Sequence, residues 1–242
     1  MKTETINYSA GPVKSEGVLV YDETVKSPRP ALLMAPSWLS IRPLSIERAQ
    51  FLAGLGYVVF MADMYGAGVR PKHPGEAAPL ANALRGDAAE SRRRIRAAYD
   101  TMVAEGNKRG IITDKRVAVG FCFGGGNVLE LARDGVDFAA AVSIHGDLKT
   151  TQPAGKGDIK AAMLVLHGAP DPVVPKADRD AFEAEMEAAG AKWEMVVFSG
   201  IVHAYTDDET PVPGVAKYDE PASRQSYAIM QAFIADAFAG KL

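Results

Sequence analysis

The sequence predicts an α/β domain in which a mostly parallel sheet carries helices on both faces. Short apolar runs rich in β-branched residues alternate with helix-length segments along the 242 residues, as in strands joined by helical crossovers. Neither an internal repeat nor a linker interrupts this alternation, so we expect a single domain over residues 1–242. A chain of this length can bury a large apolar core.

The individual elements follow from local patterns. Strands are expected near residues 5–8, 17–22, 31–35, 57–62, 116–121, 139–145, 162–167 and 193–198, about eight in all. Helical patterns lie near 43–55, 76–106, 124–133, 175–189 and 219–239. In the segment 175–189, for example, Phe182, Met186 and Ala189 recur at helical spacing, and Gly190 favours a helix end.

One strand leads into a motif that carries chemistry. The apolar run 117–119 is followed by Gly-Phe-Cys-Phe-Gly at 120–124. In α/β-hydrolases, the nucleophile elbow is a strand that leads through the pattern Gly-x-nucleophile-x-Gly into a helix. The turn is so tight that the positions two residues before and after its centre require glycine. We therefore predict that Cys122 is a nucleophile. The alternative is a buried cysteine that only fills space, as free cysteines often do.

Two partners for such a thiol follow downstream. Asp171 lies in a proline-rich loop after the strand 162–167, and His203 lies in the loop after the last strand. The order nucleophile, acid, histidine is the order of α/β-hydrolases. Asp171 could instead be a turn or cap residue, and His203 an ordinary loop histidine.

The chain resembles the dienelactone hydrolase family, also called carboxymethylenebutenolidases, from about Gly17 to the last helix. The resemblance rests on Gly-Phe-Cys-Phe-Gly-Gly-Gly at 120–126, His-Gly-Ala-Pro-Asp-Pro-Val-Val-Pro at 167–175 and Val-His-Ala-Tyr at 202–205. It implies an α/β-hydrolase fold and a triad of Cys122 as nucleophile, His203 as general base and Asp171 as its orienting partner.

An oxyanion hole needs two backbone N–H groups. One should belong to Phe123, because the residue after the nucleophile begins a helix with free N–H groups. By resemblance to the family, the second belongs to Trp38, in the loop after the strand 31–35.

Two positions depart from the family. Ser37 replaces a glutamate held to keep the resting thiol protonated, and Asp207 replaces an arginine that helps to clamp the substrate carboxylate. We therefore expect the thiol to share its proton mainly with His203. We also expect Asp207 to repel an anionic lactone, which makes dienelactone itself a doubtful substrate.

Other residues, and Ser37 with them, are candidates for binding substrate. His145 ends the strand 139–145 and could line the pocket, whereas His167 is expected to anchor the acid loop. Arg85 and Arg70 are the nearest candidates in the sequence for an anion clamp. Metal binding is not expected, because the four histidines lack ligand spacing and the chain has a single cysteine.

Composition excludes several classes of partner. The net charge of −3 gives no reason to expect nucleic acid or an anionic membrane, and no apolar run approaches the roughly 20 residues of a membrane span. The first residues contain no apolar signal-peptide core, and one cysteine forms no internal disulfide. These observations favour a cytoplasmic protein without a cofactor, and they leave open whether it is a monomer or a dimer.

The sequence as a whole predicts a hydrolase of carboxylic esters or lactones that works through an acyl-thioester intermediate. One alternative is a general short-chain carboxylesterase with an unrelated physiological substrate. The other is a non-catalytic, redox-responsive binding protein on the same scaffold, with Cys122 as an oxidisable sensor.

Overall fold

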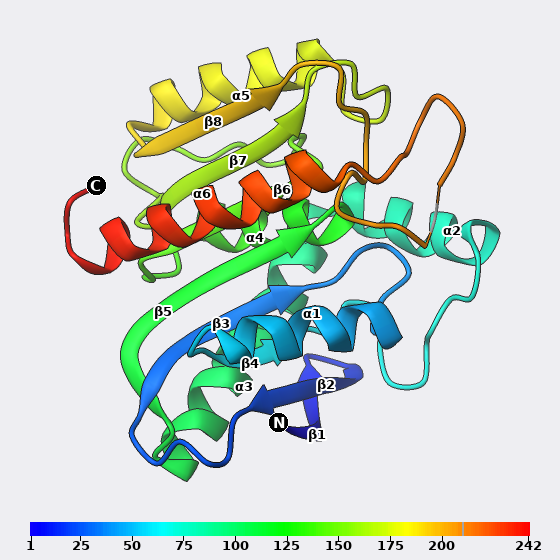
Figure 1. The fold of residues 1–242 in the computed structure, drawn as a ribbon. Coiled ribbons are helices and arrows are strands. Elements are labelled where there is room, and N and C mark those ends of the chain that lie inside the picture. The colour runs from blue at the N-terminus through cyan, green and yellow to red at the C-terminus, as the bar shows by residue number, and fades with distance from the viewer. Residues whose placement is uncertain (210) are drawn as a thin grey trace.

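The computed structural model of the chain describes residues 1–209 and 211–242. In these residues one sheet has eight strands in the order β1-β2-β4-β3-β5-β6-β7-β8 (Figure 1). Neighbouring strands from β4 to β8 run parallel, whereas β2 pairs antiparallel with β1 and β4. This confirms the expected, mostly parallel sheet. The strands are β1 (Lys2–Ala10), β2 (Val13–Tyr21), β3 (Arg29–Ala35), β4 (Val58–Met61), β5 (Ile112–Phe121), β6 (Ala140–Ile144), β7 (Ala162–Gly168) and β8 (Trp193–Phe198).

The helices cover both faces of the sheet, as expected. Those of the described residues are α1 (Pro43–Gly54), α2 (Pro74–Arg85), α3 (Ala88–Arg109), α4 (Phe123–Arg133), α5 (Lys176–Ala189) and α6 (Glu220–Phe238). Helices α1 and α6 share an apolar cluster on one face (Figure 1), and α2 to α5 contribute to the cluster on the other.

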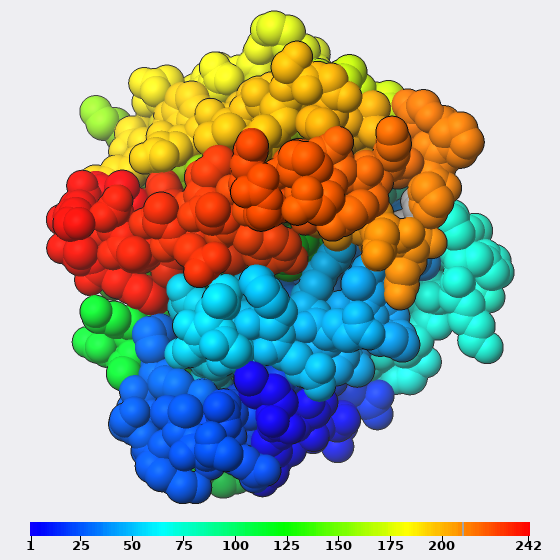
Figure 2. Space-filling model, viewed as in Figure 1, coloured from blue at the N-terminus to red at the C-terminus, as the bar shows by residue number. Residues whose placement is uncertain are grey.

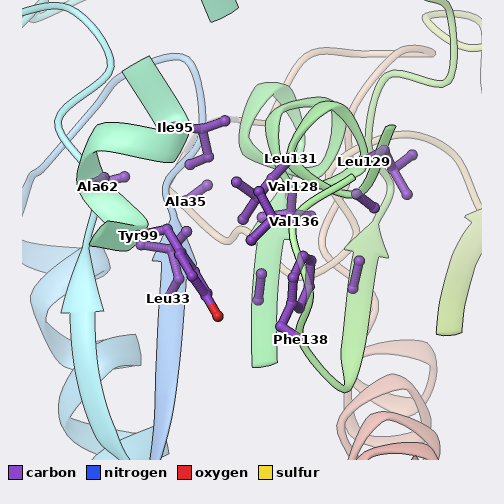
Figure 3. Packing of buried hydrophobic residues seen from close by; sticks show 14 of the residues in the cluster. Leu33, Ala35, Ala62, Ile95, Tyr99, Val128, Leu129, Leu131, Val136 and Phe138 are labelled. Atoms are coloured by element: carbon purple, nitrogen blue, oxygen red, sulfur yellow. The ribbon is translucent and has the colours of Figure 1, made fainter. Parts of the chain in front are cut away.

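The sequences of the central strands are continuous apolar runs because both faces of these strands are buried. Figure 3 shows the cluster beneath α3 and α4, where Tyr99 of α3 lies near Leu33 of β3 and Ile95 of α3 lies near Ala35. On the opposite face, Leu32 of β3 belongs to the cluster of α1 and α6. The two clusters fix the sheet and thereby the loops at its edge.

The expectation of one helical segment over 76–106 is wrong, because two helices occupy this region. Helix α2 ends at Arg85, and α3 begins after Asp87, whose side chain accepts a hydrogen bond from the N–H of Glu90. This side-chain cap satisfies an N–H that would otherwise lack a partner at the start of α3. Gly190 ends α5 in the left-handed conformation, as expected.

The topology brings the candidate residues together. Because the carboxyl ends of parallel strands meet at one edge of the sheet, the loops after β3, β5, β6, β7 and β8 gather there. Four of these loops contain Trp38 and the predicted triad, and Phe123 begins the helix that follows β5. Within the described residues, no helix has both the length and the apolar composition to cross a bilayer.

Candidate active site

Cys122 occupies the sharp turn between β5 and α4. Its backbone φ of 53° and ψ of −123° are strained for a side chain other than glycine. A Cβ atom on Gly120 would lie 2.0 Å from the carbonyl oxygen of Gly124, and one on Gly124 would lie 2.0 Å from that of Ala35. Both positions therefore require glycine, as the elbow motif predicts.

Cys122, His203 and Asp171 form a continuous hydrogen-bonded line. The Nε2 atom of His203 lies 3.2 Å from the Sγ atom of Cys122, and its Nδ1 atom lies 2.8 Å from the Oδ2 atom of Asp171. The other oxygen of Asp171 accepts the N–H groups of Val173 and Val174. Asp171 therefore forms a turn, as the alternative proposes, and also contacts His203. All three side chains are buried.

Long-range contacts fix the loop of His203. Its N–H donates to the carbonyl of Val215, and its own carbonyl accepts the N–H of Lys217. The next residue, Ala204, has a φ of 53°, and the hydroxyl of buried Tyr205 lies 2.9 Å from the Oγ atom of Ser226 in α6. The imidazole is therefore held from both sides of the loop.

The electrostatics of the line favour a charged imidazole. Burial opposes this charge, but the negative charge of Cys122 and the contacts with Asp171 and Cys122 raise the pKa of His203 to about 10. Burial also opposes the charge of Asp171, whereas the hydrogen bond with His203 and the nearby histidine charges lower the pKa of this carboxyl. The line therefore favours an imidazolium between the Cys122 sulfur and the Asp171 carboxylate.

The neighbouring histidines have separate places. The Nε2 atom of His167 lies 3.2 Å from the carbonyl oxygen of Val174, so this side chain anchors the acid loop as expected. His145 lines the cavity, and its Nε2 atom lies 2.8 Å from the Oγ1 atom of Thr206. Burial, the charge of His203 and the charge of Arg48 lower the pKa of His145 well below its ordinary value. It is therefore a neutral imidazole.

A cavity of about 360 Å³ opens over the line, which is a volume suited to a small ligand. Figure 2 shows the segment after β8, in orange, beside α2 and the residues before it, in cyan. Parts of these two segments form walls of the cavity. It is lined by Ser37, Trp38, Arg48, Pro74, Arg85, Cys122, His145, Val173, His203, Ala204, Asp207, Val212, Val215 and Ala216.

The backbone groups predicted for an oxyanion hole are available. Phe123 is the first residue of α4, so its N–H has no acceptor within the helix. Among the described residues, the N–H groups of Phe123 and Trp38 donate to no other backbone group. Trp38 lines the cavity, and its carbonyl accepts the hydroxyl of Tyr65 at 2.9 Å.

The predicted anion-clamp arginines are both engaged by acids. Arg85 lines the cavity, but its Nε atom lies 2.8 Å from Asp147. Arg70 contacts Asp63 and Glu16 and does not line the cavity. Neither guanidinium is therefore a free cation at the site.

The expected repulsion of anions by Asp207 needs correction. Asp207 does line the cavity, but Arg42 forms an ion pair with it and also contacts Glu209. Because Arg42 pairs with Asp207, this acid is not the free anion expected from the sequence. Ser37 lines the same cavity, and its carbonyl accepts the N–H of Ser40.

Arg48, in α1, was missed by the sequence reasoning. Its side chain lines the cavity and donates to the carbonyl of Thr206, 158 residues away in the chain. Arg42 and Asp207 are 165 residues apart. No local motif connects such distant positions, so neither contact could be predicted. Within the described residues, no group of histidines, cysteines and acids is arranged to hold a metal ion.

Comparisons with known proteins agree with this architecture. The sequence model of the dienelactone hydrolase family matches residues 16–238. An Escherichia coli (strain K12) protein, provisionally named carboxymethylenebutenolidase, is 24% identical over 213 residues, which cover 84% of this chain and 74% of that protein.

Two solved structures are similar over 98% of both chains. One, called m3DLH, has a TM-score of 0.90 and 33% identity. The other is a dienelactone hydrolase-like promiscuous phosphotriesterase, P91, from metagenomic libraries, with a TM-score of 0.87 and 31% identity. The chain therefore belongs to the dienelactone hydrolase family and, as its sequence predicts, to the ester and lactone hydrolases with an α/β-hydrolase fold.

Proposed function

We propose that the chain hydrolyses carboxylic esters or lactones through an acyl-thioester on Cys122. The observation that carries this proposal is the line of Cys122, His203 and Asp171, with separations of 3.2 and 2.8 Å. Cys122 and His203 also line one cavity. A buried cysteine that only fills space needs no aligned base. Likewise, a redox sensor would not need an imidazole oriented by a carboxylate.

In the first half of the reaction, the Cys122 sulfur attacks the carbonyl carbon. The electron pair of the carbonyl moves onto its oxygen, which the N–H groups of Phe123 and Trp38 stabilise. When the tetrahedral intermediate collapses, the bond to the leaving oxygen breaks and the His203 imidazolium donates its proton to that oxygen. An alcohol is released, or a lactone ring opens, and an acyl-thioester remains.

In the second half, neutral His203 takes a proton from water as the water attacks the thioester. The collapse of this intermediate releases the carboxylic acid and returns sulfur as thiolate beside the imidazolium. Asp171 holds the imidazole orientation and stabilises its charge in both halves. Because a thiolate leaves more readily than an amine, an amide intermediate would return to substrate. We therefore expect esters and activated lactones, and not peptides, to be hydrolysed.

The test combines Cys122→Ala with trapping of the intermediate. Wild-type protein should release 4-nitrophenolate from 4-nitrophenyl acetate, and acid-quenched protein should carry one acetyl group on the peptide containing Cys122. Cys122→Ala should lose at least about 10³-fold in kcat/KM, as for other covalent nucleophiles, with an unchanged circular dichroism spectrum. Turnover near the wild-type rate in Cys122→Ala would exclude the proposed nucleophile.

A second candidate activity is phosphotriester hydrolysis, because the relative with 31% identity is described as a promiscuous phosphotriesterase. The same sulfur could attack phosphorus, with the same N–H groups facing the phosphoryl oxygen. Sustained release of 4-nitrophenolate from diethyl 4-nitrophenyl phosphate would support this activity. A burst limited to one equivalent, or no release, would contradict it.

A further inference from the structure

Tyr65 contacts both residues whose N–H groups are assigned to the oxyanion hole. It lies in the loop after β4, the strand next to β3 in the sheet. Its hydroxyl donates a hydrogen bond of 2.9 Å to the carbonyl of Trp38, and its ring is stacked on that of Phe123, with centroids 5.6 Å apart and planes 23° apart. Tyr65 does not line the cavity, so any effect on substrate must pass through these two neighbours.

The backbone of Trp38 is held on both sides of its Cα atom. Its N–H shares a peptide plane with the carbonyl of Ser37, which accepts the N–H of Ser40 at 2.8 Å. Its own carbonyl lies in the next plane and accepts the hydroxyl of Tyr65. Because a trans peptide unit is planar and its N–H and C=O point in opposite directions, the two contacts together fix where the N–H of Trp38 points.

The backbone of Phe123 is held in a similar way. Its N–H shares a peptide plane with the carbonyl of Cys122, which accepts the N–H of Gly125 at 2.8 Å. The ring of Phe123 is buried and is stacked on that of Tyr65, a contact that stabilises aromatic pairs beyond the area they bury. Tyr65 thus joins the start of α4 to the loop after β3.

Tyr65 is itself held in place. The Oδ1 atom of buried Asp63 accepts the N–H groups of Tyr65 and Gly66, at 3.2 and 3.0 Å, and Arg94 donates to the carbonyl of Tyr65 at 3.2 Å. Burial raises the pKa of the Tyr65 hydroxyl, so this group keeps its proton and remains a donor near neutral pH. A fixed donor of this kind can set the geometry of the residues that it contacts.

We infer that Tyr65 is a positioning residue, which holds the N–H groups of Phe123 and Trp38 at the separation needed to bind one oxyanion. This inference rests on the proposed function and adds to it a residue outside the cavity. Donors that are already in place stabilise the developing charge without reorganising during the reaction. The hydroxyl of Tyr65 should therefore matter for steps that form an oxyanion and not for other reactions of Cys122.

Tyr99 provides a matched comparison. It is also buried, its hydroxyl donates to the carbonyl of Asp137 at 3.3 Å, and its ring lies 5.7 Å from that of Phe138. These are the same kinds of contact that Tyr65 makes, but neither partner lines the cavity or belongs to the proposed oxyanion hole. Tyr99→Phe therefore measures what the loss of a buried tyrosine hydroxyl does to the protein as a whole.

The first test uses Tyr65→Phe, which keeps the ring and removes the hydroxyl. Its kcat/KM on 4-nitrophenyl acetate should fall about 5- to 50-fold, less than the roughly 10²- to 10³-fold loss of a whole oxyanion donor. Alkylation of Cys122 by iodoacetamide, in which sulfur displaces iodide and no oxyanion forms, should change less than about twofold. Tyr99→Phe should alter neither rate more than about twofold. Unchanged hydrolysis in Tyr65→Phe, or an equal fall in hydrolysis and alkylation, would overturn the inference.

A reversible inhibitor separates this inference from the proposed turnover. The Cys122 sulfur adds to the carbonyl carbon of 1,1,1-trifluoro-4-phenylbutan-2-one, and the carbonyl electron pair moves onto oxygen, which gives a hemithioketal oxyanion without a leaving group. Tyr65→Phe should raise the inhibition constant by the factor that it takes from kcat/KM, within about threefold. Equal inhibition constants would overturn the inference.

Fluorine NMR of the same adduct applies even without turnover. If the wild-type protein hydrolyses no ester, the proposed function fails, but the dissociation constant of the adduct in wild type and Tyr65→Phe still tests Tyr65. If the wild-type protein forms no adduct, there is no oxyanion for the two N–H groups to hold, and the inference fails as well.

Discussion

Two regions face each other across the site: the elbow, at residues 120–126, and the cavity wall, at residues 203–209 and 211–216. Different interactions fix their backbones. In the elbow, glycines within a few residues of Cys122 permit backbone approaches that a Cβ would block. In the wall, partners more than 150 residues away, Arg42 and Arg48, hold Asp207 and Thr206. We infer that the elbow fixes the reacting atom, and that the wall sets which substrates reach it.

His203 is the point where the two regions meet, so its removal should have the largest effect. His203→Gln should lower kcat/KM on 4-nitrophenyl acetate by at least about 10³-fold, because attack and thioester hydrolysis both need the imidazole. Retention of the rate within tenfold would contradict the assigned base. Thermal unfolding of the variant provides the control for folding.

The same variant tests whether the Cys122 thiolate pairs with a His203 imidazolium. The raised pKa of about 10 means that His203 keeps its proton at neutral pH and loses it only as the pH rises through that value. Alkylation of Cys122 by iodoacetamide should therefore change less than about threefold between pH 6 and 8. In His203→Gln it should rise more than about tenfold, as for an ordinary thiol. Equal pH profiles in the two proteins would exclude the pair.

Ser37→Glu provides a further test of the resting thiol. This variant restores the family's carboxylate and should therefore slow the alkylation of Cys122 by iodoacetamide near pH 7.

Within the elbow, Cys122→Ser tests whether sulfur itself is required. A hydroxyl holds its proton far more tightly than a thiol, so the base suited to a thiol should activate it poorly. We expect kcat/KM on 4-nitrophenyl acetate to fall by about 10- to 10³-fold, the range of general-base effects and somewhat beyond. Equal or faster turnover would show that the thiol is incidental. Mass spectrometry should then detect the acetyl group on the introduced hydroxyl, as an oxygen ester.

Gly120→Ala tests the backbone geometry of the elbow. The added methyl group would lie 2.0 Å from the carbonyl oxygen of Gly124, so the turn must open. We expect a loss of about 1–3 kcal/mol in the free energy of unfolding, as for overpacked sites, and about 10²-fold in kcat/KM from displacement of Cys122. Gly54→Ala is the control, because its Cβ would approach only Met1, at 3.9 Å. Similar behaviour of the two variants would show that the elbow tolerates side chains.

The sequence could predict the elbow because its signal is local. The eight strands and the order of Cys122, Asp171 and His203 follow from short patterns, and one such pattern was overlooked. Asp87 followed three residues later by Glu90 is a helix-start signal that divides the region 76–106. The wall carries no such signal. Asp207 alone suggests repulsion of anions, and only the fold brings Arg42 to it and Arg48 to the cavity.

The smallest effect should come from Arg42→Met, which exposes the charge of Asp207 in the wall. Without Arg42, the carboxylate of Asp207 on the cavity surface should repel an anionic ester. We compare mono-4-nitrophenyl adipate, which is anionic, with methyl 4-nitrophenyl adipate, which is neutral. The ratio of kcat/KM for the anionic ester to kcat/KM for the neutral one should fall about 2- to 10-fold, and this fall should be greatest at low salt. Glu209→Gln is the control, because it removes the exposed partner of Arg42 and leaves the pair with Asp207 in place. If Arg42→Met leaves the ratio unchanged, the wall shapes the cavity without setting its charge.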